Sequence, residues 1–260
     1  MMSSLTYGSY LKIPELLNLQ QPLSDGPEHD EMLFIVIHQT YELWFKQILH
    51  ELKATQAALE SNDLYQSLAL IGRVRTILKT MVSQVDILET MTPLQFNSFR
   101  SRLESSSGFQ SCQFREFEAV LGRRDGFQLD SLDDEQRNRV TTAVERRSLW
   151  GSTLVLLSQR RHDIPQQLLD DSTSIITTLD EDLQVVLADI YRNDSETALL
   201  LERLVDLDEG VQEWRYRHVK MVERTIGNKM GTGGSSGVNY LASTLFQPVF
   251  PDLWAVRNHF

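Results

Sequence analysis

The amino-acid sequence predicts an all-α protein. Apolar residues recur with a period near 3.6 from residue 31 to residue 227, which places them along one face of successive helices. No stretch alternates apolar and polar residues, with β-branched enrichment, for long enough to predict a sheet strand. Hydrophobic residues make up 41% of the 260 residues, enough for a sizeable core, and no long linker divides the chain. We therefore expect one multi-helix domain over residues 1–260.

Apolar stripes and capping residues place the first four helices. Residues 30–60 are apolar on several faces, which predicts a long buried helix, and residues 64–88 carry a second regular stripe. Thr92-Pro93-Leu94-Gln95 is a capping box with proline at the first helical position, so a short helix begins there. The next helix, over residues 110–121, should end where Gly122 can adopt the left-handed conformation.

The second half of the chain predicts three more helices. Residues 131–159 read as one helix that Gly151 could interrupt, and residues 179–193 as a shorter one. The last long helix spans residues 196–226 and should end at Gly227.

Charge and cysteine content exclude several classes of function. The net charge of -11 at pH 7 opposes binding to nucleic acid or to an anionic membrane, because both need a cationic surface. Cys112 is the single cysteine, which excludes an internal disulfide, a zinc site of cysteines and covalent haem attachment. Neither a membrane-spanning apolar run nor a signal peptide is evident. We expect a cytoplasmic protein.

Two histidines lie on apolar stripes of separate predicted helices. His218 shares its stripe with Trp214 and Met221, and His38 shares its stripe with Phe34. One such histidine is more often a packed core residue than a metal ligand. Two make a shared pocket more plausible, because burying unpaired imidazoles costs hydrogen-bonding free energy. A pocket with imidazoles on opposite walls suits a non-covalently held haem.

Two further features could bind a ligand. Residues 231–237, Gly-Thr-Gly-Gly-Ser-Ser-Gly, could be a flexible linker, a hydrolase elbow of the G-x-S-x-G type or a ligand loop with a hydroxyl from Thr232. The elbow requires a preceding strand, whereas a helix is predicted there. Arg100, one turn beyond Phe96, could grip a carboxylate through two parallel hydrogen bonds. By pattern alone, a solvated surface arginine is the more common outcome.

Taken together, several short segments resemble the haem-dependent tryptophan 2,3-dioxygenase family. They occur in the family's order and span nearly the whole chain, and their combination is far more specific than any one of them. The segments are residues 5–11 (LTYGSYL), 29–34 (HDEMLF), 38–44 (HQTYELW), 99–100 (FR), 107–111 (SGFQS), 214–218 (WRYRH) and 231–237 (GTGGSSG).

The resemblance implies an α-helical homotetramer that encloses one b-type haem in each subunit. It implies that His218 is the proximal ligand of the iron. It makes His38 the distal residue that hydrogen-bonds with the indole N–H, with Phe34 packing on the indole. Ser107 and Gly108 would line the haem pocket.

The resemblance also implies how the amino-acid end of the substrate is held. Arg100 would bind the carboxylate, and Thr232 the carboxylate or the ammonium group. Phe96 belongs to the same subsite, where some bacterial members carry tyrosine, so this chain lacks that hydroxyl contact. Residues 1–28 would form an N-terminal arm.

Three residues of that arm would close the pocket of a neighbouring subunit. They are Tyr7, Tyr10 and Leu11.

The reaction implied is insertion of both atoms of O2 across the indole C2–C3 bond of L-tryptophan, which gives N-formylkynurenine. Relatives that oxygenate a substituted tryptophan once, to a 2-oxindole, suggest an alternative. A non-enzymatic haem sensor is a further alternative, but a sensor would give Arg100 and Thr232 no role.

Overall fold

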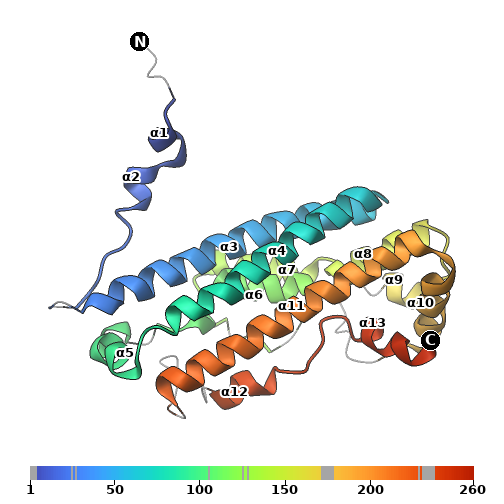
Figure 1. Ribbon diagram of the computed structural model, residues 1–260. Helices are drawn as coiled ribbons and strands as arrows, with labels where there is room; N and C mark the ends of the chain where they lie inside the picture. The colour runs from blue at the N-terminus through green and yellow to red at the C-terminus, as the bar shows by residue number, and fades with distance from the viewer. Residues whose placement is uncertain are drawn as a thin grey trace.

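The computed structural model confirms the all-α fold for the part of the chain that it describes. That part contains helices and no strand. Its core is formed by three long helices, α3 (His29–Glu60), α4 (Leu64–Leu88) and α11 (Ser195–Ile226), which run along one another in Figure 1. The described residues are 5–24, 26, 28–104, 106–124, 126–127, 129–170, 179–227, 229 and 238–260.

Helix α4 lies between α3 and α11 and packs against both. It begins at the N-cap Asp63, whose carboxylate accepts a hydrogen bond from the backbone amide of Gln66. Residues at helical spacing along α4, such as Ile71 and Leu78, are buried against Ile48 of α3 and other apolar side chains. The period seen in the sequence therefore corresponds to the face that each long helix buries.

The prediction of one helix over residues 131–159 is wrong. The chain instead forms α7 (Asp134–Glu145) and α8 (Leu149–Gln159), with an extended residue at Arg146. The Ser148 hydroxyl accepts a hydrogen bond from the Gly151 amide at 3.1 Å and so starts a new helix, with Gly151 inside it. The guanidinium of Arg124 donates hydrogen bonds to three carbonyls at the end of α7, which satisfies that helix end.

The predicted caps are confirmed. The Thr92 hydroxyl and the Gln95 side chain exchange hydrogen bonds with each other's backbone amides, and Gly122 and Gly227 have φ angles of 121° and 60° at their helix ends. The remaining described elements are α1 (Tyr7–Leu11), α2 (Ile13–Leu16), α5 (Pro93–Phe99), α6 (Cys112–Leu121), α9 (Gln166–Asp170), α10 (Glu181–Asn193), α12 (Val238–Ser243), α13 (Pro251–Ala255) and the 3-10 turns η1 (Arg100–Leu103), η2 (Gly108–Gln110) and η3 (Val256–His259). None of the helices in the described ranges is long and apolar enough to cross a membrane.

The N-terminal arm projects away from the helical body (Figure 1). Its base is fastened to the start of α3 by Glu31, whose buried carboxylate accepts hydrogen bonds from the amides of Leu23 at 2.7 Å and Ser24 at 3.1 Å. Burial by itself raises the pKa of Glu31, but the hydrogen bonds from Ser24 and Leu23 outweigh it, so the pKa lies below its usual value. The arm therefore leaves the body at a fixed place.

A buried aspartate fixes the C-terminal segment to α11. Oδ2 of Asp208 accepts hydrogen bonds from the amides of Val249 at 2.8 Å and Phe250 at 3.0 Å, and from the Trp254 indole at 2.9 Å. One turn further along α11, the side chain of Gln212 donates to the carbonyl of Gln247. This anchor determines where α12, which precedes the segment, returns to the bundle.

Candidate active site

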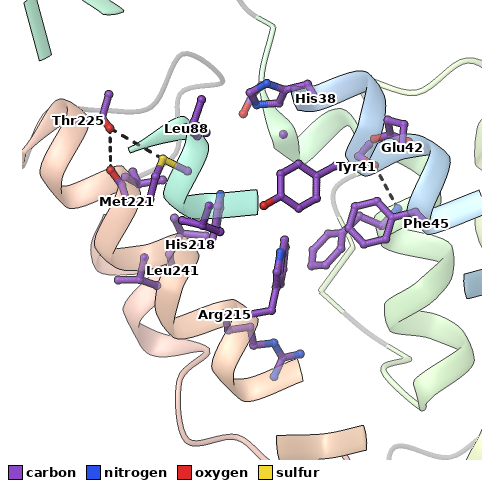
Figure 2. Close-up of a pocket in the computed structure, with 18 of the residues that line it drawn as sticks. His38, Tyr41, Glu42, Phe45, Leu88, Arg215, His218, Met221, Thr225 and Leu241 are labelled. Atoms are coloured by element: carbon purple, nitrogen blue, oxygen red, sulfur yellow. Dashed lines mark hydrogen bonds between the residues drawn. The ribbon is translucent and has the colours of Figure 1, made fainter. Parts of the chain in front are cut away.

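A cavity of about 300 Å³ lies among α3, α4, α5, α6, α11 and α12. Figure 2 shows His38 and Tyr41 projecting from α3 on one side, and His218 and Met221 from α11 on the other. Seven residues selected from the sequence lie on its walls: Phe34, His38, Phe96, Arg100, Ser107, Gly108 and His218. Tertiary folding thus brings together segments that are far apart in the chain.

His218 presents a neutral imidazole to the cavity. Burial, and secondarily the proximity of His38, lower its pKa to about 4, so the ring is unprotonated near neutral pH. Among the described residues, no hydrogen bond engages either ring nitrogen of His218. The Trp214 indole lies parallel to the ring, with 5.4 Å between centroids and 2° between planes. The lone pair of the imidazole is therefore available to a metal ion.

The tautomer of His38 follows from one hydrogen bond. Its Nδ1 lies 2.7 Å from the carbonyl oxygen of Phe34, so a neutral ring must carry its proton on Nδ1 and donate it there. Although the ring is open to the cavity, burial among the surrounding protein atoms lowers the pKa of His38. The hydrogen bond with the Phe34 carbonyl and the charge of Glu42 act in the opposite direction. Nε2 is left as a hydrogen-bond acceptor. His38 can thus receive a ligand N–H.

Aromatic side chains form the wall beside His38. The Phe34 ring lies 4.0 Å from the His38 ring, 5.8 Å from Phe96 and 5.6 Å from Phe99, measured between centroids. Met91 extends this apolar surface. Such a wall accepts a flat aromatic ligand, and Phe96 offers no hydroxyl to the ligand.

A cluster of charged residues forms another part of the cavity wall. Arg115 and Arg123 lie 2.6 Å and 3.0 Å from carboxylate oxygens of Glu118, and Arg215 lies 4.0 Å from it. Burial lowers the pKa of Arg215, with Glu118 as the largest opposing influence. Three of these four groups are cationic, so this wall suits an anionic ligand.

Sequence reasoning did not select this arginine cluster. The available signal was the placement of Arg115 and Glu118 on an amphipathic helix, between the apolar residues Phe114 and Leu121. Charged residues flanked in this way must pair when the helix is buried. The partner Arg215 comes from α11, and nothing local in the sequence indicates that contact.

Arg100 and the turn after it lie at a further edge of the cavity. Arg100 is half-buried where α5 passes into η1, and Ser107 and Gly108 lie at the start of the next 3-10 turn. A Cβ atom placed on Gly108 would meet no atom within 4 Å, so the space beside this glycine is open. Glu104, which precedes this turn, has a φ of 48°, a left-handed conformation that is rare for a non-glycine residue.

Three predicted site residues do not line this cavity, and a fourth falls outside the described residues. Tyr7, Tyr10 and Leu11 are on the projecting arm, where 78%, 70% and 42% of their surfaces are exposed. Thr232 and the rest of residues 231–237 lie outside the described residues.

The residues of the cavity fit haem. A haem needs an axial donor, and His218 supplies a neutral imidazole without a hydrogen-bond partner in the described chain. The macrocycle needs apolar walls, which Val219, Val222 and Leu88 help to form. Its two propionates need cationic groups, and the cluster of Arg115, Arg123 and Arg215 around Glu118 lies on the same cavity.

Fold and site together define an all-α protein with a histidine-lined cavity whose chemistry suits a prosthetic group. Comparison with known proteins identifies the family. The family model described as tryptophan 2,3-dioxygenase matches residues 1–151 and 128–260. The chain belongs to the tryptophan 2,3-dioxygenase family.

Individual relatives match along almost the entire chain. The tryptophan 2,3-dioxygenase of Herpetosiphon aurantiacus is 55% identical over 258 residues, covering 99% of both chains. That of Anaeromyxobacter sp. (strain K) is 56% identical, covering 98% of this chain and 96% of the relative. That of Arthrobacter sp. (strain FB24) is 42% identical, covering 98% and 92%.

Proposed function

We propose that this protein is a haem-dependent oxygenase that inserts both atoms of O2 across the indole C2–C3 bond of L-tryptophan, giving N-formylkynurenine. The observation that carries the proposal is one cavity that joins the neutral imidazole of His218, whose ring nitrogens have no hydrogen-bond partner among the described residues, to the acceptor nitrogen of His38. Relatives named tryptophan 2,3-dioxygenase, matched over nearly their whole length, support it.

One haem b would be held in each subunit. His218 would bind the iron, Arg115, Arg123 and Arg215 would receive the propionates, and Gly108 would leave room beside the macrocycle. The bound haem supplies the site at which O2 binds and is activated. The protein contributes position, electrostatics and exclusion of water.

The substrate would be oriented by three contacts. Phe34 would pack on the indole, while Nε2 of His38 accepts the indole N–H. Arg100 would bind the carboxylate through two parallel hydrogen bonds, with Phe96 as an apolar neighbour, and Thr232 would hold the carboxylate or ammonium group. Orientation by several weak contacts is how a site of this kind lowers the barrier.

We also propose a homotetramer in which the N-terminal arm completes a neighbouring site. The arm carries a series of exposed apolar residues that the body of its own chain does not cover, Tyr7, Tyr10 and Leu11 among them. A surface of this kind is typical of a segment that packs against another subunit.

The proposal is tested with purified, haem-loaded protein and isotopically labelled O2. Mass spectrometry of the product from L-tryptophan should find two labelled oxygens. A single labelled oxygen in a 2-oxindole, from L-tryptophan or from β-methyltryptophan, would show monooxygenation instead. Haem binding without any product would indicate a sensor or carrier.

The iron ligand is tested with a pair of histidine variants. His218→Ala should lose most bound haem, whereas His162→Ala should retain it, because His162 contacts Asp194 at the start of α11, away from the cavity. Full haem content and turnover in His218→Ala would refute the assignment.

A further inference from the structure

Glu42 lines the cavity, but the proposed chemistry gives it no role. It lies one helical turn after His38, and Figure 2 shows both residues on α3. The side-chain amide of Gln113 on α6 donates two hydrogen bonds to Glu42, one to the carboxylate Oε2 at 2.7 Å and one to the backbone carbonyl at 2.8 Å. Both hydrogens of that amide are then used on Glu42, so the position of the carboxylate is fixed.

The carboxylate of Glu42 differs from the other carboxylate on the cavity wall, which belongs to Glu118. Arg115 and Arg123 lie 2.6 Å and 3.0 Å from oxygens of Glu118, so ion pairs balance its charge. Within the described ranges, no cationic side chain forms an ion pair with Glu42, and the side chain that contacts its carboxylate is the neutral amide of Gln113. The negative charge of Glu42 is therefore left to act on the cavity.

The charges of the cavity wall show what Glu42 contributes to them. The described part of the wall carries four guanidinium groups and two carboxylates, while burial keeps both histidines neutral near pH 7. The charged groups belong to Arg100, Arg115, Arg123, Arg215, Glu42 and Glu118. Their excess of two positive charges equals the charge of the two propionates of haem b. Without Glu42, one further positive charge would remain beside ferrous haem.

The field of Glu42 reaches the part of the cavity that His38 faces. Burial lowers the pKa of His38, whereas the Phe34 carbonyl and the charge of Glu42 oppose that effect. A charge acts over a longer distance in a protein cavity than in bulk water, because the effective dielectric constant is lower. Haem held between His218 and His38 would therefore lie within the field of Glu42.

We propose that Glu42 is an electrostatic residue that lowers the reduction potential of the haem and selects against anionic ligands of the iron. The inference rests on the proposed role of His218 as the iron ligand. Ferric haem carries one positive charge more than ferrous haem, so a nearby carboxylate stabilises the ferric state. The same carboxylate repels an anion that approaches the iron but has little effect on a neutral molecule such as O2. The polarity of the pocket is one of the properties by which a protein tunes a haem.

The test compares two substitutions of Glu42 in the haem-loaded protein. Glu42→Gln removes the charge but keeps the shape and an oxygen that can accept from Gln113, whereas Glu42→Asp keeps the charge but alters that hydrogen bond. Glu116→Gln on α6 is the matched control, because Glu116 pairs with Arg139 at 2.6 Å and does not line the cavity. Haem content should stay close to wild type in all three variants.

We expect Glu42→Gln to raise the reduction potential, measured by spectroelectrochemical titration. Its ferric form should bind azide about tenfold more tightly, which is the size of the interaction between unit charges roughly 10 Å apart at an effective dielectric constant of about 20. Its affinity for imidazole, a neutral ligand, should match that of the wild type. Glu42→Asp and Glu116→Gln should stay close to the wild type in all three measurements.

Three outcomes would overturn the inference while leaving the proposed function intact. The first is a Glu42→Gln protein with wild-type potential and azide affinity. The second is an equal shift in Glu42→Asp and Glu42→Gln, which would assign the effect to the hydrogen bond with Gln113. The third is loss of haem from Glu42→Gln, which would assign Glu42 a packing role. By contrast, a wild-type protein that binds no haem, or a His218→Ala variant that retains it, would refute the proposed function itself.

Discussion

Replacing Asp208 with alanine should destabilise the protein by about 3–5 kcal/mol. The Asp208 side chain is fully buried, and one of its oxygens accepts three hydrogen bonds from N–H donors on residues 249–254. Each buried donor left without an acceptor costs about 1–3 kcal/mol. We use the lower part of that range because Trp254 is 41% exposed, so water can replace the carboxylate at its indole nitrogen.

The same substitution should affect the active site. Leu241 and Thr244 of the α12 region line the cavity, and the Asp208 anchor holds the segment that follows them. Loosening that segment should raise KM for L-tryptophan more than it lowers haem content, because His218 remains inside an intact α11.

Urea unfolding followed by far-UV circular dichroism measures the stability, and steady-state kinetics measures KM. The matched control is Asp206→Ala on the same helix. Asp206 pairs with Arg75 at 2.9 Å and Arg203 at 2.7 Å near the surface, where such pairs contribute about 1 kcal/mol or less. Equal losses of stability in the two variants would refute the assignment of Asp208 as the anchor.

Three further predictions concern the site. Arg100→Ala should lower kcat/KM by orders of magnitude at unchanged haem content, because losing a charge-assisted contact to a buried carboxylate costs about 2–5 kcal/mol. Normal affinity of this variant for L-tryptophan would show that the carboxylate is held elsewhere. His38→Ala should keep haem and measurable turnover. The wild type should turn over 1-methyltryptophan poorly, because the methyl group would collide with the imidazole. Equal turnover of L-tryptophan and 1-methyltryptophan would exclude the contact between His38 and the indole N–H. Burial lowers the pKa of His218 to about 4 from 6.5. As the pH falls, the imidazole is therefore protonated at a higher pH in the unfolded chain than in the folded chain. The stability of the haem-free protein should therefore decrease as pH falls from 6.5 toward 4, and His218→Gln should weaken that dependence; an unchanged pH profile in the variant would contradict the assigned shift.

Local interactions made most of the helices predictable from the sequence. A helix end depends on residues within one turn, so the capping box at Thr92 and the glycine at Gly227 could be recognised directly. The apolar stripes likewise identified His38 and His218 as residues facing the interior. The error over residues 131–159 arose because both halves have helical periodicity. The break depends on Ser148 as a cap and on Arg124, which comes from outside the segment.

The sequence by itself determined most of the helices and two candidate imidazoles, whereas the tertiary structure decided what surrounds them. Arg215 meets Glu118, and Tyr41 meets Met81, only when α11, α6, α3 and α4 pack together. The distance between Nδ1 of His38 and the Phe34 carbonyl oxygen identifies Nε2 as the hydrogen-bond acceptor of the neutral ring. Helix periodicity specifies which face is apolar, but it carries no information about which residues of another helix that face meets, because those partners are set by packing across the whole bundle.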